Sequence, residues 1–118
     1  MKKNILKDKS FLFAIRAINL YKYLKKEQQE FVISKQIMRS GTAIGALIRE
    51  AEFAESTKDF IHKFSIGLKE ANETLYWLDL LVATDFIDEK MHQSLKIDCE
   101  ELLKLLISTI KTSKQKIK

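Results

Sequence analysis

Two histidines in this sequence each follow an acidic residue by three positions, since Asp59 precedes His62 and Glu89 precedes His92. Di-iron helical bundles use this spacing because it places a carboxylate and an imidazole on one helix face. Both pairs, however, fall in the first turn of a predicted helix, where acidic residues also stabilise the helix dipole. In antiparallel helices these two turns lie roughly 35 Å apart at 1.5 Å per residue. The pairs therefore cannot share one ion, and we predict no metal site.

The single cysteine, Cys99, has no partner for an intramolecular disulfide and occupies a position on an apolar stripe. Such a position favours a small core residue over a nucleophile. The sequence also lacks a glycine-rich phosphate loop, a Walker motif and a Cys-x-x-Cys pair. We therefore predict a protein without enzymatic activity and without a cofactor.

Charge is distributed unevenly along the chain. Residues 1–49 carry a net charge of +8, residues 50–103 carry −8 and residues 104–118 carry +5, with an isoelectric point near 9.3. Clustered lysines at both ends of the chain are compatible with electrostatic attraction to nucleic acid. The alternative interpretation is a solvated surface that has no partner.

The composition favours long helices in one domain that spans residues 1–118. The sequence contains no proline and only three glycines, and 46% of its residues are hydrophobic. The longest stretch without a charged residue, Ser40 to Ile48, has nine residues, whereas a membrane span needs about 18. Charged residues also interrupt the apolar stretch that a signal peptide would need. We expect a cytoplasmic protein.

The first helix is predicted over residues 10–25 and carries two apolar rows at helical spacing. One row contains Phe11, Ile15 and Ile18, and the other contains Phe13, Ala17, Leu20 and Leu24. The rows lie on separate faces, so a single bundle covers only one of them. The second row therefore predicts an oligomer.

The second helix is predicted over residues 28–54. Its apolar stripe consists of Ile33, Ile37, Ile44, Ile48 and Ala51. Gly41 and Gly45 share one face although each glycine costs up to about 1 kcal/mol relative to alanine in a helix. This cost indicates a close crossing with another helix.

A capping box marks the start of the third helix, with Ser56 as N-cap and Asp59 three residues later. The stripe that follows keeps heptad spacing, which is typical of a helical bundle. Residues 84–88 form the predicted turn, and Asp88 caps a fourth helix whose stripe ends at Ile110. The basic tail over residues 111–118 is expected to fray. Short connections predict an all-α, antiparallel, up-down-up-down four-helix bundle.

In this topology the start of the first helix and the end of the fourth emerge at the same end of the bundle. Eight lysines then converge, and they are the predicted nucleic-acid-binding residues. They are Lys2, Lys3, Lys7, Lys9, Lys111, Lys114, Lys116 and Lys118. If substitution of the lysines of the tail leaves nucleic-acid binding unchanged, the alternative site consists of Lys22, Lys25, Lys26, Lys35, Arg39 and Arg49.

The stretch Arg39–Ala51, with Phe60, Ser65–Glu73 and Tyr76–Leu78, resembles the four-helix bundle proteins encoded in intervening sequences of 23S ribosomal RNA genes. The resemblance covers nearly the whole chain. The residues that match its core pattern are Arg39, Ser40, Ile44, Ile48, Glu50 and Glu73. Leu47 occupies the position where the family usually has asparagine, so no role for that amide is carried over.

The resemblance implies a ring-shaped homopentamer without enzymatic activity. The family is also similar to the accessory protein of diversity-generating retroelements, a basic pentamer that binds nucleic acid and a reverse transcriptase. We expect this chain to bind nucleic acid, or a partner such as a reverse transcriptase, by analogy of fold and charge alone.

The matching charged residues also have a structural interpretation. Arg39 and Glu50 lie three helical turns apart, so each is expected to meet a charge on a neighbouring helix or subunit, such as Glu73. Tyr76 and Trp77 are expected in a core or subunit-interface layer. The sequence thus predicts a non-enzymatic, homo-oligomeric protein that binds RNA or DNA through lysines. The alternative is a scaffold ring that docks a protein partner and binds no nucleic acid.

Overall fold

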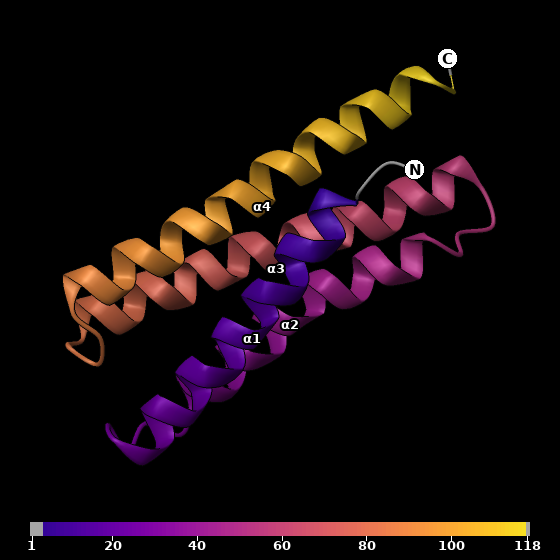
Figure 1. Cartoon of the computed structure of the whole chain (residues 1–118). Helices are drawn as coiled ribbons and strands as arrows, with labels where there is room; N and C mark the ends of the chain where they lie inside the picture. The colour runs from indigo at the N-terminus through magenta and orange to yellow at the C-terminus, as the bar shows by residue number, and fades with distance from the viewer. Residues whose placement is uncertain (1–3, 118) are drawn as a thin grey trace.

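The computed structural model describes residues 4–117 and contains four long helices connected by short loops (Figure 1). The helices are α1 (Ile5–Lys26), α2 (Ile33–Ala51), α3 (Thr57–Ala83) and α4 (Glu89–Gln115). No strand occurs within the described residues. The predicted all-α fold is therefore confirmed, and the body measures 49 × 26 × 21 Å.

The helices form an antiparallel bundle in which each helix packs on the next and α1 contacts α4 along a narrower seam. The start of α1, the end of α4 and the α2–α3 connection lie toward the same end of the molecule (Figure 1). We call this the terminal end, and the α1–α2 and α3–α4 connections lie at the opposite end. None of the four helices, within residues 4–117, has an apolar segment long enough to cross a membrane.

The core consists of the apolar stripes that the helical spacing predicted. On α1 the row formed by Phe13, Ala17, Leu20 and Leu24 is buried. The other row is not covered, because Phe11, Ile15 and Ile18 are exposed on the outside of the bundle. The prediction of one uncovered apolar row on this helix is confirmed.

Helix α2 is shorter than predicted at both ends. Gln29 adopts a left-handed backbone conformation with φ of 51°, which interrupts the helical path after α1. The Glu30 carboxylate then accepts hydrogen bonds from the backbone N–H groups of Val32, Ile33 and Ser34, so the helix begins at Ile33. After Ala51 the backbone bonds tighten to i−3 spacing and the helix ends.

The starts of α3 and α4 follow the predicted capping. Ser56 Oγ accepts a hydrogen bond from Asp59 N at 3.0 Å, and Asp88 Oδ1 accepts one from Met91 N at 2.8 Å. The end of α4 differs from the expectation of fraying from Lys111, since the helix continues to Gln115. Ser113 is buried one turn beyond Ile110 and anchors this last segment.

The close crossing predicted at the two glycines of α2 is the contact between α1 and α2. A Cβ atom at Gly41 would lie 2.7 Å from Ala17 Cβ, a distance that no real pair of Cβ atoms tolerates. A Cβ atom at Gly45 would lie 3.4 Å from the backbone oxygen of Ser10. Gly41 therefore sets the separation of the two helices, and Gly45 lies at a looser part of the same crossing.

Candidate nucleic-acid interface

The described members of the predicted lysine cluster lie on the half of the bundle toward the terminal end, but they do not form one group, because Lys9 pairs with Glu101, ten residues before Lys111 on α4. Lys7 and Lys9 lie near the start of α1, and Lys111, Lys114 and Lys116 lie at the end of α4. The other three predicted residues, Lys2, Lys3 and Lys118, fall outside the described residues.

The two lysines of α1 form ion pairs with other helices. Lys7 Nζ lies 2.9 Å from a carboxylate oxygen of Glu52, and Lys9 Nζ lies 3.2 Å from one of Glu101. These carboxylates offset much of the charge that the two lysines would offer a phosphate. Sequence reasoning missed the pairing because both acidic partners are distant in the chain.

The lysines of α4 differ in this respect. Lys111, Lys114 and Lys116 are exposed, and none of them forms an ion pair with any residue between 4 and 117. We call these three residues the terminal lysines. Among the described members of the predicted cluster, they are the ones with charge still available to an anion.

A recess of about 490 Å³, which we call the terminal recess, lies between the last turns of α4, the end of α2 and the first turn of α3. Lys116 is one of its lining residues. Hydroxyl groups line much of it, contributed by Ser56, Thr57, Ser108, Thr109, Thr112 and Ser113. Ser56 and Thr57 belong to the start of α3, where Ser56 Oγ caps the helix and Asp59 lies in the first turn. The hydroxyl-rich run of residues 108–113 was the sequence signal that could have indicated this terminal recess.

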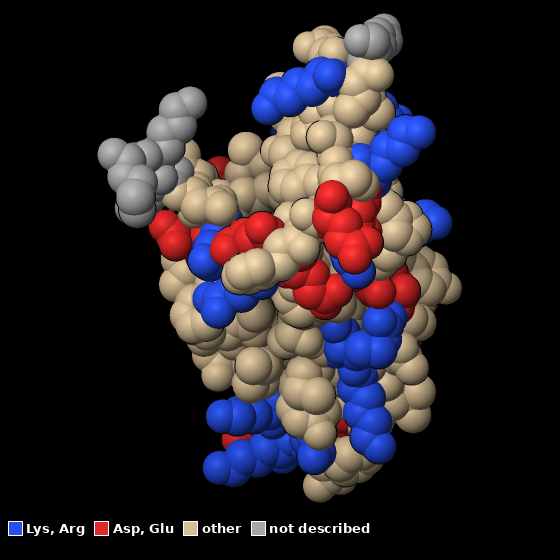
Figure 2. All heavy atoms as spheres, turned by 90° about the vertical axis from the view of Figure 1, so that its right-hand side faces the viewer, with Lys and Arg blue, Asp and Glu red and all other residues tan. Residues whose placement is uncertain are grey.

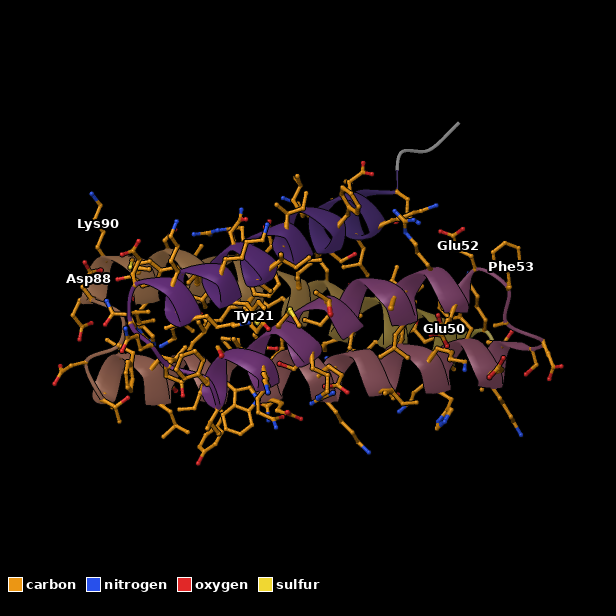
Figure 3. All side chains as sticks on the ribbon, turned by 90° about the horizontal axis from the view of Figure 1, so that it is seen from below. Tyr21, Glu50, Glu52, Phe53, Asp88 and Lys90 are labelled. Carbon is orange, nitrogen blue, oxygen red and sulfur yellow. The ribbon has the colours of Figure 1, made fainter. Side chains whose placement is uncertain are left out.

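The charge around the terminal end is divided into zones. Figure 2 looks onto this end and shows a band of Asp and Glu side chains between two groups of Lys and Arg. Glu50 and Glu52 lie at this end together with the exposed Phe53, whereas Asp88 and Lys90 lie at the opposite end (Figure 3). Negative charge at this end is therefore concentrated in one band, which we call the acidic band.

The charged residues of the family pattern join α2 to α3 within one chain. Arg39 lies 3.2 Å from Glu70 and 2.5 Å from Glu73, and Trp77 Nε1 donates a hydrogen bond to Glu73 at 3.0 Å. Hydrogen bonds to Glu70 and then Glu73 raise the pKa of Arg39 above its ordinary value. Glu50 lies 3.3 Å from Lys63 of α3. The prediction that Arg39 and Glu50 meet charges on a neighbouring helix is confirmed.

The uncharged residues of the pattern pack the same pair of helices. Ile44 and Ile48 belong to the core, and Ser40 is fully buried with its Oγ 2.7 Å from Thr74 Oγ1. Leu47, at the position of the family's asparagine, is half-buried and lies near Gly67 of α3. The pattern thus describes how α2 fits α3.

The two histidines and the cysteine, whose side chains could bind a metal or act in catalysis, lie apart from one another. His62 is exposed at the start of α3, whereas His92 is buried at the start of α4 with Nε2 2.8 Å from Asp79 Oδ1. Cys99 is buried in the core, and burial raises its pKa to about 12. No three His, Cys, Asp or Glu side chains between residues 4 and 117 are grouped to hold a metal ion.

Tyr76 is exposed and Trp77 is half-buried beside it, with ring centroids 5.2 Å apart.

Comparison with known proteins identifies relatives of this chain. The family described as 23S rRNA-intervening sequence protein matches residues 2–108. A solved structure from Bacteroides thetaiotaomicron, described as a protein of unknown function from the S23 ribosomal protein family, is 60% identical with a TM-score of 0.90. The match covers 91% of this chain and 99% of that chain. No curated protein matches the chain significantly.

Proposed function

This chain belongs to the 23S rRNA-intervening sequence protein family, and from its geometry we propose that it binds the phosphate backbone of RNA or DNA without catalysing a reaction. One observation carries the proposal. The terminal lysines are exposed and have no carboxylate partner among residues 4–117, and one of them, Lys116, lines the hydroxyl-rich terminal recess.

The groups at this site are those that proteins use to hold phosphates. Lysine side chains and serine and threonine hydroxyls contact phosphate oxygens in nucleic-acid complexes. Such contacts position a strand but carry no sequence information. The proposed activity is therefore binding with little sequence preference, oriented by the acidic band that crosses the same end.

The uncovered row of α1 supports assembly of several copies. Phe11, Leu12 and Ile15 are 52%, 61% and 41% exposed, and Ile18 extends the same apolar surface. Burial of one such side chain contributes about 1.5–3 kcal/mol. We propose that copies of the chain associate through this face, and the resemblance noted above favours a ring of five. A ring would present several sets of terminal lysines to one nucleic acid.

The test measures binding of a fluorescent single-stranded RNA by anisotropy at a series of salt concentrations. The triple variant Lys111→Glu, Lys114→Glu and Lys116→Glu is expected to bind more weakly. A plot of the logarithm of its binding constant against the logarithm of the salt concentration should have a slope shallower by about 2, since each phosphate contact on a single strand contributes about 0.7. The matched control, with the same change of charge away from the terminal end, is Lys69→Glu, Lys90→Glu and Lys96→Glu.

Two results would contradict this proposal. If the wild-type protein binds neither RNA nor DNA at about 50 mM salt, where phosphate contacts are strong, nucleic-acid binding is wrong. The exposed face of α1 then favours the scaffold that docks a protein partner. If the terminal and control variants lose affinity equally, binding does not occur at the terminal lysines.

A further inference from the structure

A second surface with unused binding groups lies at the opposite end of the bundle. A groove of about 460 Å³ is lined by Tyr21, Lys22, Lys25, Lys26 and Phe31, and its lining is mainly apolar. It lies where the last turns of α1 meet the α1–α2 connection. We call it the aromatic groove, and its Tyr21 is labelled in Figure 3.

The exposed aromatic ring of this groove follows an anchored stretch of backbone. Phe31 is 53% exposed although it follows a segment that is firmly held. Glu30 N donates to the carbonyl oxygen of Leu24 at 2.9 Å, and the Glu30 carboxylate binds the first N–H groups of α2. Because the residue before it is anchored on both sides, Phe31 is presented to solvent by the fold.

The positive charge of the groove is not neutralised by nearby carboxylates. Lys22 and Lys26 are exposed and form no ion pair within residues 4–117. Lys25 lies 3.0 Å from the Tyr21 hydroxyl and 4.8 Å above the Tyr21 ring. Glu30 is buried and occupied by backbone N–H groups, so its oxygens do not face the lysines as free acceptors.

The helix dipole explains only part of this arrangement. Lysines in the last turn of a helix are stabilised by the negative end of its dipole. That effect accounts for Lys25 and Lys26, but it gives no reason to expose Phe31 beside them. An aromatic face next to unpaired cations is the combination by which proteins hold unpaired bases and their phosphates.

We propose that the aromatic groove binds a single-stranded segment of nucleic acid, with a base stacked on Phe31 and the adjoining phosphates on Lys22 and Lys26. This inference rests on the proposed function and names its ligand more narrowly. A duplex cannot use the groove in this way because its bases are already stacked inside the helix. Single strands should therefore gain affinity from Phe31, whereas duplexes should not.

The experiment compares a 12-nucleotide oligo(U) with a 12-base-pair RNA duplex, both measured by anisotropy. Phe31→Ala is expected to weaken oligo(U) binding about 5- to 150-fold, the range of one lost base stack, and to leave duplex binding unchanged. Phe31→Trp should retain the affinity and show quenching of fluorescence beyond that of the wild type. Val32→Ala is the matched control, because Val32 is the exposed apolar neighbour, at 71%.

The results separate this inference from the proposed function. Unchanged oligo(U) binding by Phe31→Ala would overturn the aromatic groove while binding at the terminal lysines stands. An equal loss for oligo(U) and duplex would also overturn it, since stacking of an unpaired base predicts a difference. If Phe31→Ala selectively weakens oligo(U) and the terminal-lysine variant has no effect, the groove is supported and the terminal site is wrong. If Phe31→Ala weakens the binding of an acidic, aromatic peptide but leaves oligo(U) binding unchanged, the groove binds a protein instead.

Discussion

At the scale of single residues, the family pattern describes packing more directly than it describes a binding site. Arg39 holds Glu70 and Glu73 of α3, and Ser40 is buried against Thr74. These contacts use the functional groups of the pattern inside the chain. The terminal lysines lie outside that pattern, and so do the exposed Lys22, Lys26 and Phe31 of the aromatic groove.

Cys99 gives a residue-scale prediction about pH. Its Sγ lies 3.4 Å from the carbonyl oxygen of Ala71, and burial, with Glu100 and Asp98, raises its pKa from 9.0 to about 12. The protonated thiol contributes its full stability below the unfolded pKa of 9.0, and this contribution is lost as pH rises through the folded value. We expect urea midpoints of the wild type to fall more steeply than those of Cys99→Ala as pH increases from 9.0 toward 12. Parallel pH profiles of the two proteins would show that the thiol titrates normally.

At the scale of helices, local signals determined which boundaries the sequence could predict. The starts of α3 and α4 were predicted because Ser56 and Asp88 accept hydrogen bonds from the following turn. The start of α2 was not predicted, because its cap is Glu30, which lies in a connection that was predicted to be helical. Spacing of apolar residues predicts the face of a helix well, but an unusual cap such as Glu30 gives little signal.

The crossing of α1 and α2 gives a prediction at this scale. Gly41→Ala places a methyl group 2.7 Å from Ala17 Cβ, and overpacking of this kind costs about 1–3 kcal/mol. That cost should exceed the gain of up to about 1 kcal/mol from alanine's helix propensity. We expect a lower urea midpoint for Gly41→Ala.

Gly45→Ala is the matched control because its methyl group would meet Ser10 at 3.4 Å, near an ordinary contact distance. It should have an equal or higher midpoint than the wild type. Gly45→Leu, by contrast, would extend a branched side chain toward Ser10 and should lower the midpoint. Equal midpoints for the two alanine variants would mean that the helices separate without cost at Gly41.

At the scale of the whole molecule, charge was harder to predict than fold. The sequence placed eight lysines at one end of the bundle, but it did not indicate that Glu52 and Glu101 pair with Lys7 and Lys9. Ion pairs between distant residues depend on how the helices are rotated and staggered. The apolar rows of α1, which depend only on local spacing, were predicted correctly on both faces.

The uncovered face of α1 leads to the prediction for the assembly. Leu12→Glu with Ile15→Glu places two charges on this face, whose side chains are 61% and 41% exposed, so the isolated bundle should still fold. Light scattering should then give the monomer mass of 13.8 kDa, whereas the wild type should give a multiple of it. Ile97→Glu, at a 55% exposed position on α4, is the control and should keep the wild-type mass. A wild-type monomer at micromolar concentration would show that the face does not join copies.

The same variant connects assembly to binding. Several sets of terminal lysines on one assembly raise the effective concentration of each set at the nucleic acid, without any new contact. The Leu12→Glu, Ile15→Glu variant retains every lysine, yet it should bind a long RNA much more weakly than the wild type does. Its affinity for an RNA too short to reach two copies should change far less, because such an RNA uses one set of lysines in either protein. Equal losses on long and short RNA would instead place the nucleic-acid contact on the α1 face itself.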